Sequence, residues 1–249
     1  MTARVLVTGG AKGIGAGVVR ALVAAGHEVV FTYRSSAGQA TELADALCSS
    51  SGLSVKALAL DLADKAAVAG FCAEASALGD IHGLVHNAGQ SYDTLSMMLA
   101  QDKAEAAMQV NFWSFTQLVN CFVRPMMARR RGRVIAIGSV TASRANQGNA
   151  AYAASKAALE AYMRTLSLET AKRGITANTI APGFVDTDMM GAYAAYRTKM
   201  ESQIPAGRFA RPEEIGALAA FLMSPQAAYI TGATIPVDGG LMASMGLHR

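Results

Sequence analysis

The sequence contains little cysteine, little histidine and few charged residues. Three of its 249 residues are cysteine and four are histidine, and only 16% are charged, whereas 52% are hydrophobic. The cysteines are odd in number and lack the spacing of metal ligands, and no histidine motif of a metal site is present. We therefore expect no metal site, and we expect Cys48, Cys72 and Cys121 to be reduced packing residues of a cytoplasmic protein.

Long apolar runs are also missing. No run approaches the roughly 18 residues needed to cross a membrane, and the first expected strand begins at Arg4, so we expect neither a membrane span nor a signal peptide. The net charge of +4 is mild and comes without the basic stripe of a nucleic-acid-binding protein. The length suits one core, so we assign residues 1–249 to a single domain.

Strand-like and helix-like segments alternate along the chain. We expect strands near 4–8, 28–33, 54–60, 83–86, 133–138, 175–181 and 233–237, and helices near 14–25, 36–50, 64–78, 101–130, 151–173 and 212–223. This order predicts a doubly wound α/β fold of Rossmann type, with about seven parallel strands and helices on both faces. The longest irregular stretch, about 183–211, is expected to be a substrate lid, whose methionines serve either an acyl chain or the core.

A glycine cluster follows the first expected strand. Gly9, Gly13 and Gly15 form the pattern G-x-x-x-G-x-G directly before a helix. The spacing differs from the dinucleotide fingerprint G-x-G-x-x-G. Nevertheless, a strand, a glycine loop, a helix and a second strand form a unit in which the helix N-terminus binds phosphate. The sequence therefore predicts a dinucleotide site.

Charge indicates which dinucleotide binds. NAD-binding units carry an acidic residue at the end of the second strand, but here the segment T-Y-R-S-S has none. Arg34 and Lys12 would instead meet a 2′-phosphate, which favours NADP(H); the alternative is that both cations are merely solvated. Asp61, at the end of the third strand, either bonds the adenine amino group or caps the next helix.

A tyrosine and a lysine four residues apart share one face of an expected helix. They are Tyr152 and Lys156, and Ser139 closes the apolar run R-V-I-A-I-G-S upstream. A lysine ammonium beside a phenol lowers the pKa of the phenol from its usual value of about 10. The three side chains could hold a carbonyl oxygen and protonate it. The alternative is a surface tyrosine and lysine on an ordinary helix.

Taken together, these motifs resemble the short-chain dehydrogenase/reductase family along essentially the whole chain. They are T-G-G-A-K-G-I-G at 8–15, N-A-G at 87–89, Asn111, Ser139, Y-x-x-x-K at 152–156 and P-G at 182–183. Segments such as P-G-F-V-D-T-D-M are similar to the 3-oxoacyl-[acyl-carrier-protein] reductase branch. The resemblance implies NADPH-dependent reduction of a β-ketoacyl thioester in fatty acid, polyketide or polyene synthesis. The alternatives are another NADP-dependent ketone or alcohol oxidoreductase and a non-catalytic NADP-binding sensor or scaffold.

The resemblance also implies roles for single residues. Asn111 either joins a water chain that relays protons to Lys156 or is a satisfied polar residue between helices. The candidate catalytic residues are Asn111, Ser139, Tyr152 and Lys156. The candidate cofactor-binding residues are Gly9, Lys12, Gly13, Ile14, Gly15, Arg34, Asp61, Leu62, Asn87, Ala88, Gly89, Tyr152, Lys156, Pro182, Gly183, Val185 and Thr187.

Arginines cluster around the end of the expected helix at 101–130. They either stabilise the negative end of the helix dipole or dock an acidic partner near the catalytic end. The resemblance makes Arg130 and Arg173 the best candidates for contacting an acidic acyl carrier protein. It further suggests a homotetramer built partly through the two long helices.

Overall fold

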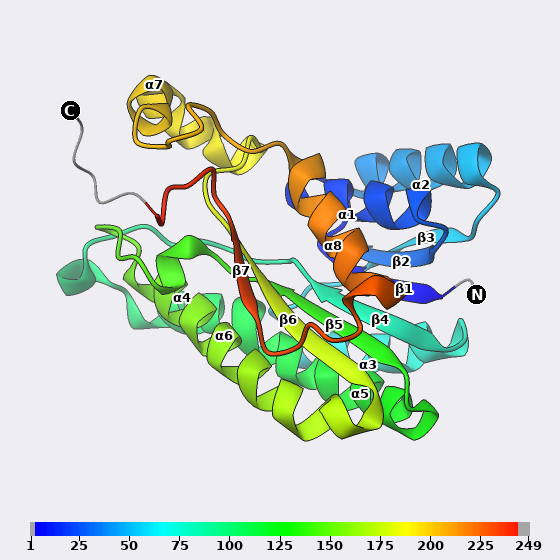
Figure 1. The fold of residues 1–249 in the computed structure, drawn as a ribbon. Helices are drawn as coiled ribbons and strands as arrows, with labels where there is room; N and C mark the ends of the chain where they lie inside the picture. Colours follow the sequence, from blue (N-terminus) through cyan, green and yellow to red (C-terminus); the bar gives the residue numbers. More distant parts are fainter. Residues whose placement is uncertain (1–2, 244–249) are drawn as a thin grey trace.

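The computed structural model describes residues 3–243 and shows a parallel sheet between two layers of helices (Figure 1). The strands lie in the order β3-β2-β1-β4-β5-β6-β7, and every neighbouring pair is parallel. They are β1 (Arg4–Thr8), β2 (Glu28–Tyr33), β3 (Val55–Ala59), β4 (Ile81–His86), β5 (Gly132–Ile137), β6 (Ile175–Pro182) and β7 (Thr234–Val237). The predicted seven-stranded doubly wound fold is confirmed.

Each face of the sheet buries its own apolar cluster. Successive side chains of a strand point to opposite faces, so Leu6 of β1 lies in one cluster while Val5 and Val7 lie in the other. The helices α1 (Gly13–Ala24), α2 (Ala37–Ser51) and α8 (Pro212–Met223) cover the Val5 face, and α3 (Lys65–Ala77), α5 (Ser114–Arg129) and α6 (Ala150–Thr170) cover the Leu6 face. Because both faces are covered, the strands are mostly apolar. Short 3-10 segments lie at Ser96–Met98, Val140–Ala142, Ala171–Arg173 and Pro225–Ala227.

The strand order reverses beside β1, which pairs with β2 on one side and β4 on the other. In an open parallel sheet, ligands bind beyond the carboxyl ends of the strands at such a reversal. The glycine loop follows β1, the N-A-G loop follows β4 and Ser139 follows β5. The topology therefore brings these motifs to one edge of the sheet.

The helix expected at 101–130 is interrupted. The structure has α4 (Gln101–Met108), a π-helical turn at Gln109–Trp113 and then α5. The widened turn inserts a residue without ending the helix. Local helix propensity does not predict it, because the contacts that hold Asn111 in the turn come from the β4–α4 loop and from α6.

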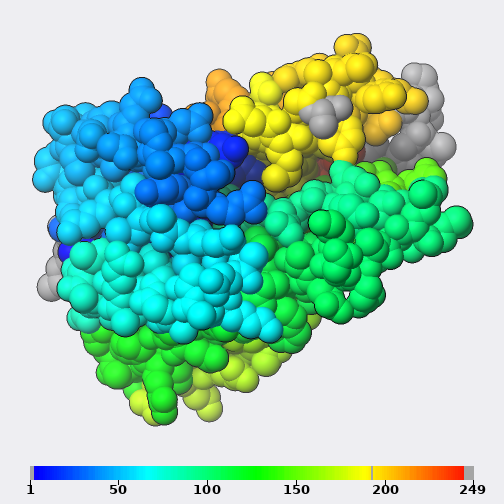
Figure 2. Space-filling model, turned by 180° about the vertical axis from the view of Figure 1, so that it is seen from behind, coloured from blue at the N-terminus to red at the C-terminus, as the bar shows by residue number. Residues whose placement is uncertain are grey.

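About half of the stretch 183–211 is helical, whereas the sequence predicted an irregular segment. It contains a 3-10 segment at Asp188–Tyr196, labelled η5, and α7 (Arg197–Glu201). Its two ends are joined by the pairing of Val185 with Ala210 and by a hydrogen bond from Asp186 N to Ala210 O of 2.8 Å. In Figure 2 the surface is hollowed between this yellow segment and the blue and green parts of the chain. We refer to 183–211 as the lid segment.

The expectation of three reduced cysteines is wrong for two of them. Cys72 of α3 and Cys121 of α5 form a disulfide, with their Cα atoms 6.1 Å apart, whereas Cys48 is free. The two cysteines are 49 residues apart in the sequence, so their spacing does not predict that they pair. The packing of α3 on α5 brings the two thiols together.

Within residues 3–243, no helix combines the length and the hydropathy that a membrane span requires. In the same part of the chain, no three side chains of histidine, cysteine, aspartate or glutamate are grouped to hold a metal ion.

Candidate active site

Ser139, Tyr152 and Lys156 meet at the carboxyl end of β5. Ser139 follows the strand and shares a hydrogen bond of 2.8 Å with Thr141, while Tyr152 and Lys156 lie one turn apart on α6. The Tyr152 phenol also hydrogen-bonds with Ser139. The Lys156 ammonium is buried, donates to the carbonyl oxygen of Ile137 at 2.8 Å and lies 5.5 Å from the centroid of the Tyr152 ring. The predicted convergence of the three side chains is thus present.

The pKa of Tyr152 differs from the expectation. Removal from water raises the pKa of Tyr152 to about 12, the Asp93 carboxylate adds to the rise, and the hydrogen bond with Ser139 opposes it. Burial lowers the pKa of Lys156 to about 8. The pKa of Tyr152 is therefore raised where a lowering was expected from the nearby amine, because removal of the phenol from water is the largest influence on it. Tyr152 carries its proton at neutral pH, which is the form that donates.

Asn111 is fully buried at the centre of the π-helical turn. Its side-chain oxygen accepts from Gln90 N at 2.8 Å, and its amide nitrogen donates to Gln90 O at 3.0 Å and to Ser155 Oγ at 2.9 Å. Asn111 is thus a satisfied polar residue between helices, and it also ties the β4–α4 loop to the helix of Lys156.

Gly89 brings the N-A-G loop against the same side chains. A Cβ placed on Gly89 would lie 3.3 Å from Lys156 Nζ and 3.4 Å from Asn111 Oδ1. The first distance is tighter than most Cβ contacts and the second is ordinary van der Waals contact, so the backbone of the loop passes close to the lysine and the asparagine. The loop, Asn111 and Lys156 form one contiguous site.

The glycine loop is shaped as a cradle. Gly9 and Gly13 have φ angles of 66° and 52°, which glycine adopts without strain. A Cβ on Gly15 would collide with the Gly9 carbonyl group and lie 2.6 Å from Asn87 Nδ2. That amide donates to Thr8 O at 3.1 Å and to Gly9 O at 2.9 Å, so Asn87 supports the loop. The N-terminus of α1 begins at Gly13, and a tight glycine loop at a helix N-terminus fits a dinucleotide pyrophosphate.

The two cations expected at the 2′-phosphate lie where β1 and β2 end. Lys12 immediately precedes α1 and Arg34 immediately follows β2, and both side chains are exposed. The acidic candidate Asp61 is exposed too and accepts from Ala63 N at 2.9 Å. Asp64, not Asp61, caps α3, so the helix-cap alternative for Asp61 is wrong.

The remaining cofactor candidates contribute differently. The side chains of Leu62 and Val185 are buried in the core, so a cofactor would meet their main chains. Ile14 and Ala88 are partly buried and pack against the two apolar clusters. Pro182 ends β6, and Gly183 N donates to Val237 O at 3.0 Å, which joins the P-G segment to β7. Thr187 lies beside the glycine loop, because a Cβ on Gly13 would sit 3.2 Å from Thr187 Cγ2.

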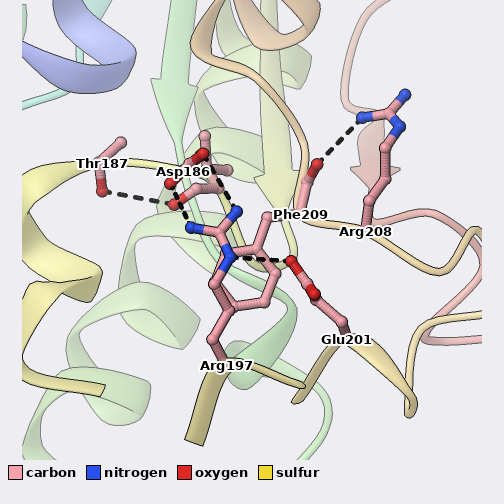
Figure 3. A network of polar contacts seen from close by, with 7 residues as sticks. Asp186, Thr187, Arg197, Glu201, Arg208 and Phe209 are labelled. Carbon is pink, nitrogen blue, oxygen red and sulfur yellow. Dashed lines mark hydrogen bonds and ion pairs between the residues drawn. The ribbon is translucent and has the colours of Figure 1, made fainter. Parts of the chain in front are cut away.

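An ion-pair network that the sequence analysis did not predict joins Asp186, near the start of the lid segment, to Arg197 and Glu201 of α7 (Figure 3). The Arg197 guanidinium donates to both carboxylate oxygens of Asp186 at 2.8 and 3.1 Å and to Glu201 at 2.8 Å, and it lies 4.7 Å from the centroid of the Phe209 ring. A cavity of about 330 Å³ adjoins this network and is also lined by Met190.

A second network joins the lid segment to the other side of the site. Asp93, in the β4–α4 loop, accepts from Asn149 Nδ2 at 2.9 Å and from the hydroxyl groups of Tyr193 and Ser91. The bond with Tyr193 raises the pKa of that phenol to about 12. No sequence motif marks these residues, because Asp93, Asn149 and Tyr193 come from three segments far apart in the chain.

The arginines considered for docking are not near the catalytic end of the same chain. Arg130 immediately follows α5, and its guanidinium donates to Lys172 O at 3.0 Å, next to Arg173. Both arginines precede strands β5 and β6, whereas Ser139 follows β5. Because β5 has six residues, about 20 Å of strand separates the two edges. The expectation of docking near the catalytic end is therefore wrong within one chain.

The chain is similar to known enzymes over nearly its whole length. A family model described as enoyl-(acyl carrier protein) reductase matches residues 9–242. The 3-oxoacyl-[acyl-carrier-protein] reductase of Salmonella typhimurium is 40% identical over 238 residues, which are 95% of this chain and 96% of that relative.

Solved structures agree with this assignment. A proposed NAD(P)-dependent gluconate 5-dehydrogenase of Beutenbergia cavernae, solved with NADP bound at low occupancy, superposes with a TM-score of 0.93 at 33% identity and 97% coverage of both chains. A proposed β-ketoacyl-carrier-protein reductase gives a TM-score of 0.88 at 31% identity, with 97% of this chain and 98% of that chain covered. Fold, site and similarity agree, and the chain belongs to the short-chain dehydrogenase/reductase family.

Proposed function

We propose that the protein is an NADPH-dependent 3-oxoacyl-[acyl-carrier-protein] reductase, which converts a β-ketoacyl thioester to the 3-hydroxyacyl thioester. One observation carries the proposal. Ser139, Tyr152 and Lys156 converge beside a glycine cradle in a chain that is 40% identical to a reductase of that name over 95% of its length. The carrier protein that delivers the substrate determines whether the reaction belongs to fatty acid or to polyketide synthesis.

The chemistry follows from the protonation states. When bound, NADPH would supply the hydride that reduces the ketone carbon. Ser139 donates a hydrogen bond to the ketone oxygen, on which negative charge develops. Tyr152, protonated at neutral pH because its pKa is about 12, gives its proton to that oxygen. Lys156, with a pKa of about 8, is largely protonated at pH 7, and its charge stabilises the phenolate that remains.

Asn111 has a supporting role in the proposal. It holds Ser155, the neighbour of Lys156, and the main chain of Gln90 at the end of the N-A-G loop. A water chain from Asn111 to Lys156 would then replace the proton that Tyr152 gives away, as the family resemblance implies.

The choice of NADP(H) rests on charge. The family uses NAD(P), and the gluconate dehydrogenase relative was solved with NADP. Lys12 and Arg34 place two exposed cations at the ends of β1 and β2, where no carboxylate competes for the ribose. A 2′-phosphate would neutralise both, whereas NAD would leave them unused.

Docking of an acidic carrier at Arg130 and Arg173 requires a second subunit. Since both arginines lie at the sheet edge opposite Ser139, an oligomer such as a tetramer would have to bring the active site of one chain to the arginines of another. Charge reversal at both positions should then raise the KM for a carrier-linked substrate and leave a small free ketone unaffected. Equal loss with both substrates would contradict docking.

A cytoplasmic location is part of the same proposal, and cell fractionation would test it.

The central test compares substrates and one variant. NADPH consumption is measured with acetoacetyl thioester on the carrier and with a panel of sugar, steroid and small ketones. We expect the carrier thioester to have the highest kcat/KM, and we expect Tyr152→Phe to abolish turnover while NADPH still binds. Preference for another ketone would indicate a different oxidoreductase. Binding of NADPH without any turnover would indicate a sensor or scaffold.

A further inference from the structure

His86, the last residue of β4, stands directly before the N-A-G loop and is fully buried. Its ring stacks on Phe115 of α5, with 4.9 Å between the ring centroids and 29° between the planes. A phenylalanine would fill the same space, so packing alone does not explain why this position holds a histidine. The hydrogen bonds made by the two ring nitrogens of His86 explain it.

The partners of His86 define one tautomer. Nε2 lies 3.2 Å from the main-chain oxygen of Asn111, and Nδ1 lies 3.1 Å from Thr8 Oγ1. A carbonyl oxygen can only accept, so Nε2 carries the hydrogen and Nδ1 accepts from the Thr8 hydroxyl. Burial, together with the charge of Lys156, lowers the pKa of His86 to about 3, which keeps the ring neutral.

One end of this arrangement is the N-A-G loop. Thr8 Oγ1 accepts from the main-chain N–H groups of Asn87 and Ala88, each at 3.1 Å. The hydroxyl therefore accepts two hydrogen bonds and donates one, which uses its full capacity. The Thr8 hydroxyl can serve the loop and the histidine at once only if His86 accepts.

The other end is the catalytic side of the site. The side chain of Asn111 is bonded to Gln90 and to Ser155, next to Lys156, while its main chain lies in the π-helical turn. Such turns are rare and less regular than α-helix, so contacts from outside the helix position them. His86 provides such a contact, because its ring hydrogen-bonds with the main-chain oxygen of Asn111, the central residue of the turn.

We propose that His86 is a positioning residue, which fixes the main chain of Asn111, and through it the lysine-bearing helix α6, relative to the N-A-G loop. The inference rests on the proposed function, since it assumes that Asn111 and Lys156 support proton delivery. It assigns His86 no direct contact with substrate.

Two variants separate positioning from packing. His86→Phe keeps the ring stacked on Phe115 but loses both hydrogen bonds, whereas His86→Gln keeps a neutral N–H donor directed toward the Asn111 carbonyl. A displacement of about 1 Å in an active site costs about 100-fold in rate. We therefore expect kcat to fall about 10- to 100-fold in His86→Phe, and to be restored to within about threefold of the wild type in His86→Gln. The Kd for NADPH should change little in either variant.

A purely structural histidine gives a different result. Both variants would then lose thermal stability while kcat per folded site stays at the wild-type value, and that result would overturn the proposal. A double-mutant cycle tests the route through Asn111: in the Asn111→Ala background, His86→Phe should cause no further loss of kcat. Full additivity of the two losses would show that His86 does not act through Asn111.

A measurement without turnover keeps the inference distinct from the proposed function. The ¹⁵N spectrum of the wild-type imidazole should show a neutral ring protonated at Nε2 between about pH 5 and 8. A charged ring or an Nδ1–H tautomer would overturn the inference even in an active enzyme. A wild-type protein that reduces no β-ketoacyl thioester, yet shows the Nε2–H ring, would instead refute the proposed function alone.

Discussion

Substitution of Gly89 by alanine is the most direct probe of the site. The added Cβ would lie 3.3 Å from Lys156 Nζ, which must move by a few tenths of an ångström, and 3.4 Å from Asn111 Oδ1, which leaves no spare room on that side. Neither moves freely, because Lys156 is bonded to Ile137 at 2.8 Å and Asn111 to Gln90 and α6. The strain therefore falls on the catalytic side chains.

The displacement of the catalytic side chains sets the size of the expected loss of rate. If a displacement of about 1 Å costs about 100-fold in rate, one of about 0.3 Å costs about fourfold. The φ angle of Gly89 is not in the left-handed region, so alanine is compatible with its backbone. Alanine also reduces the freedom of the unfolded chain, which contributes about 0.4–1 kcal/mol of stability. We expect Gly89→Ala to lose activity without losing much stability.

The assay is NADPH oxidation with an acetoacetyl thioester, combined with urea unfolding. The matched control is Gly70→Ala on α3, because a Cβ there meets nothing within 4 Å. The control should gain about 1 kcal/mol of stability with kcat unchanged. An unchanged kcat in Gly89→Ala would refute the close approach of the N-A-G loop to Lys156, and a fall in the control as well would point to a general effect of the substitution.

Three further predictions concern the cofactor, the disulfide and acid stability. Arg34→Ala should weaken NADPH binding about tenfold, the loss of a charged hydrogen bond, while NADH binding stays within error; equal losses would argue against recognition of the 2′-phosphate. The Cys72–Cys121 bridge spans 49 residues, so its reduction should lower the free energy of unfolding by about 4 kcal/mol. Thiol titration of the unfolded, unreduced protein should find only Cys48, whereas three thiols would contradict the pairing. His86 has a folded pKa of about 3 and an unfolded pKa of about 6.5, so the unfolded state binds an extra proton between those values and stability falls as the pH falls. Between pH 7.5 and 5 this costs roughly 2 kcal/mol, and His86→Phe should lose that part of the pH dependence in urea unfolding.

Local pattern was sufficient for most of the architecture. The strands at 4–8 and 28–33 and the helix at 212–223 lie at their predicted positions, and the other strands differ by one or two residues at an end. The reason is that strands buried on both faces read as nearly continuous apolar runs, and a glycine loop between a strand and a helix is the pattern that binds phosphate. Ser139, Tyr152 and Lys156 could be identified for the same reason, because a strand end and a helix face converge at one edge of such a sheet.

Properties that depend on distant neighbours were not predictable. The helix expected at 101–130 contains a π-helical turn around Asn111, whose side chain is held by Gln90 and Ser155. The pKa of Tyr152 is raised rather than lowered, because removal of the phenol from water is the largest influence on it. The sequence by itself determined the order of elements and the residue types at the site. Only the tertiary structure decided how these residues are hydrogen-bonded, paired and desolvated, because those properties arise from contacts between segments far apart in the chain.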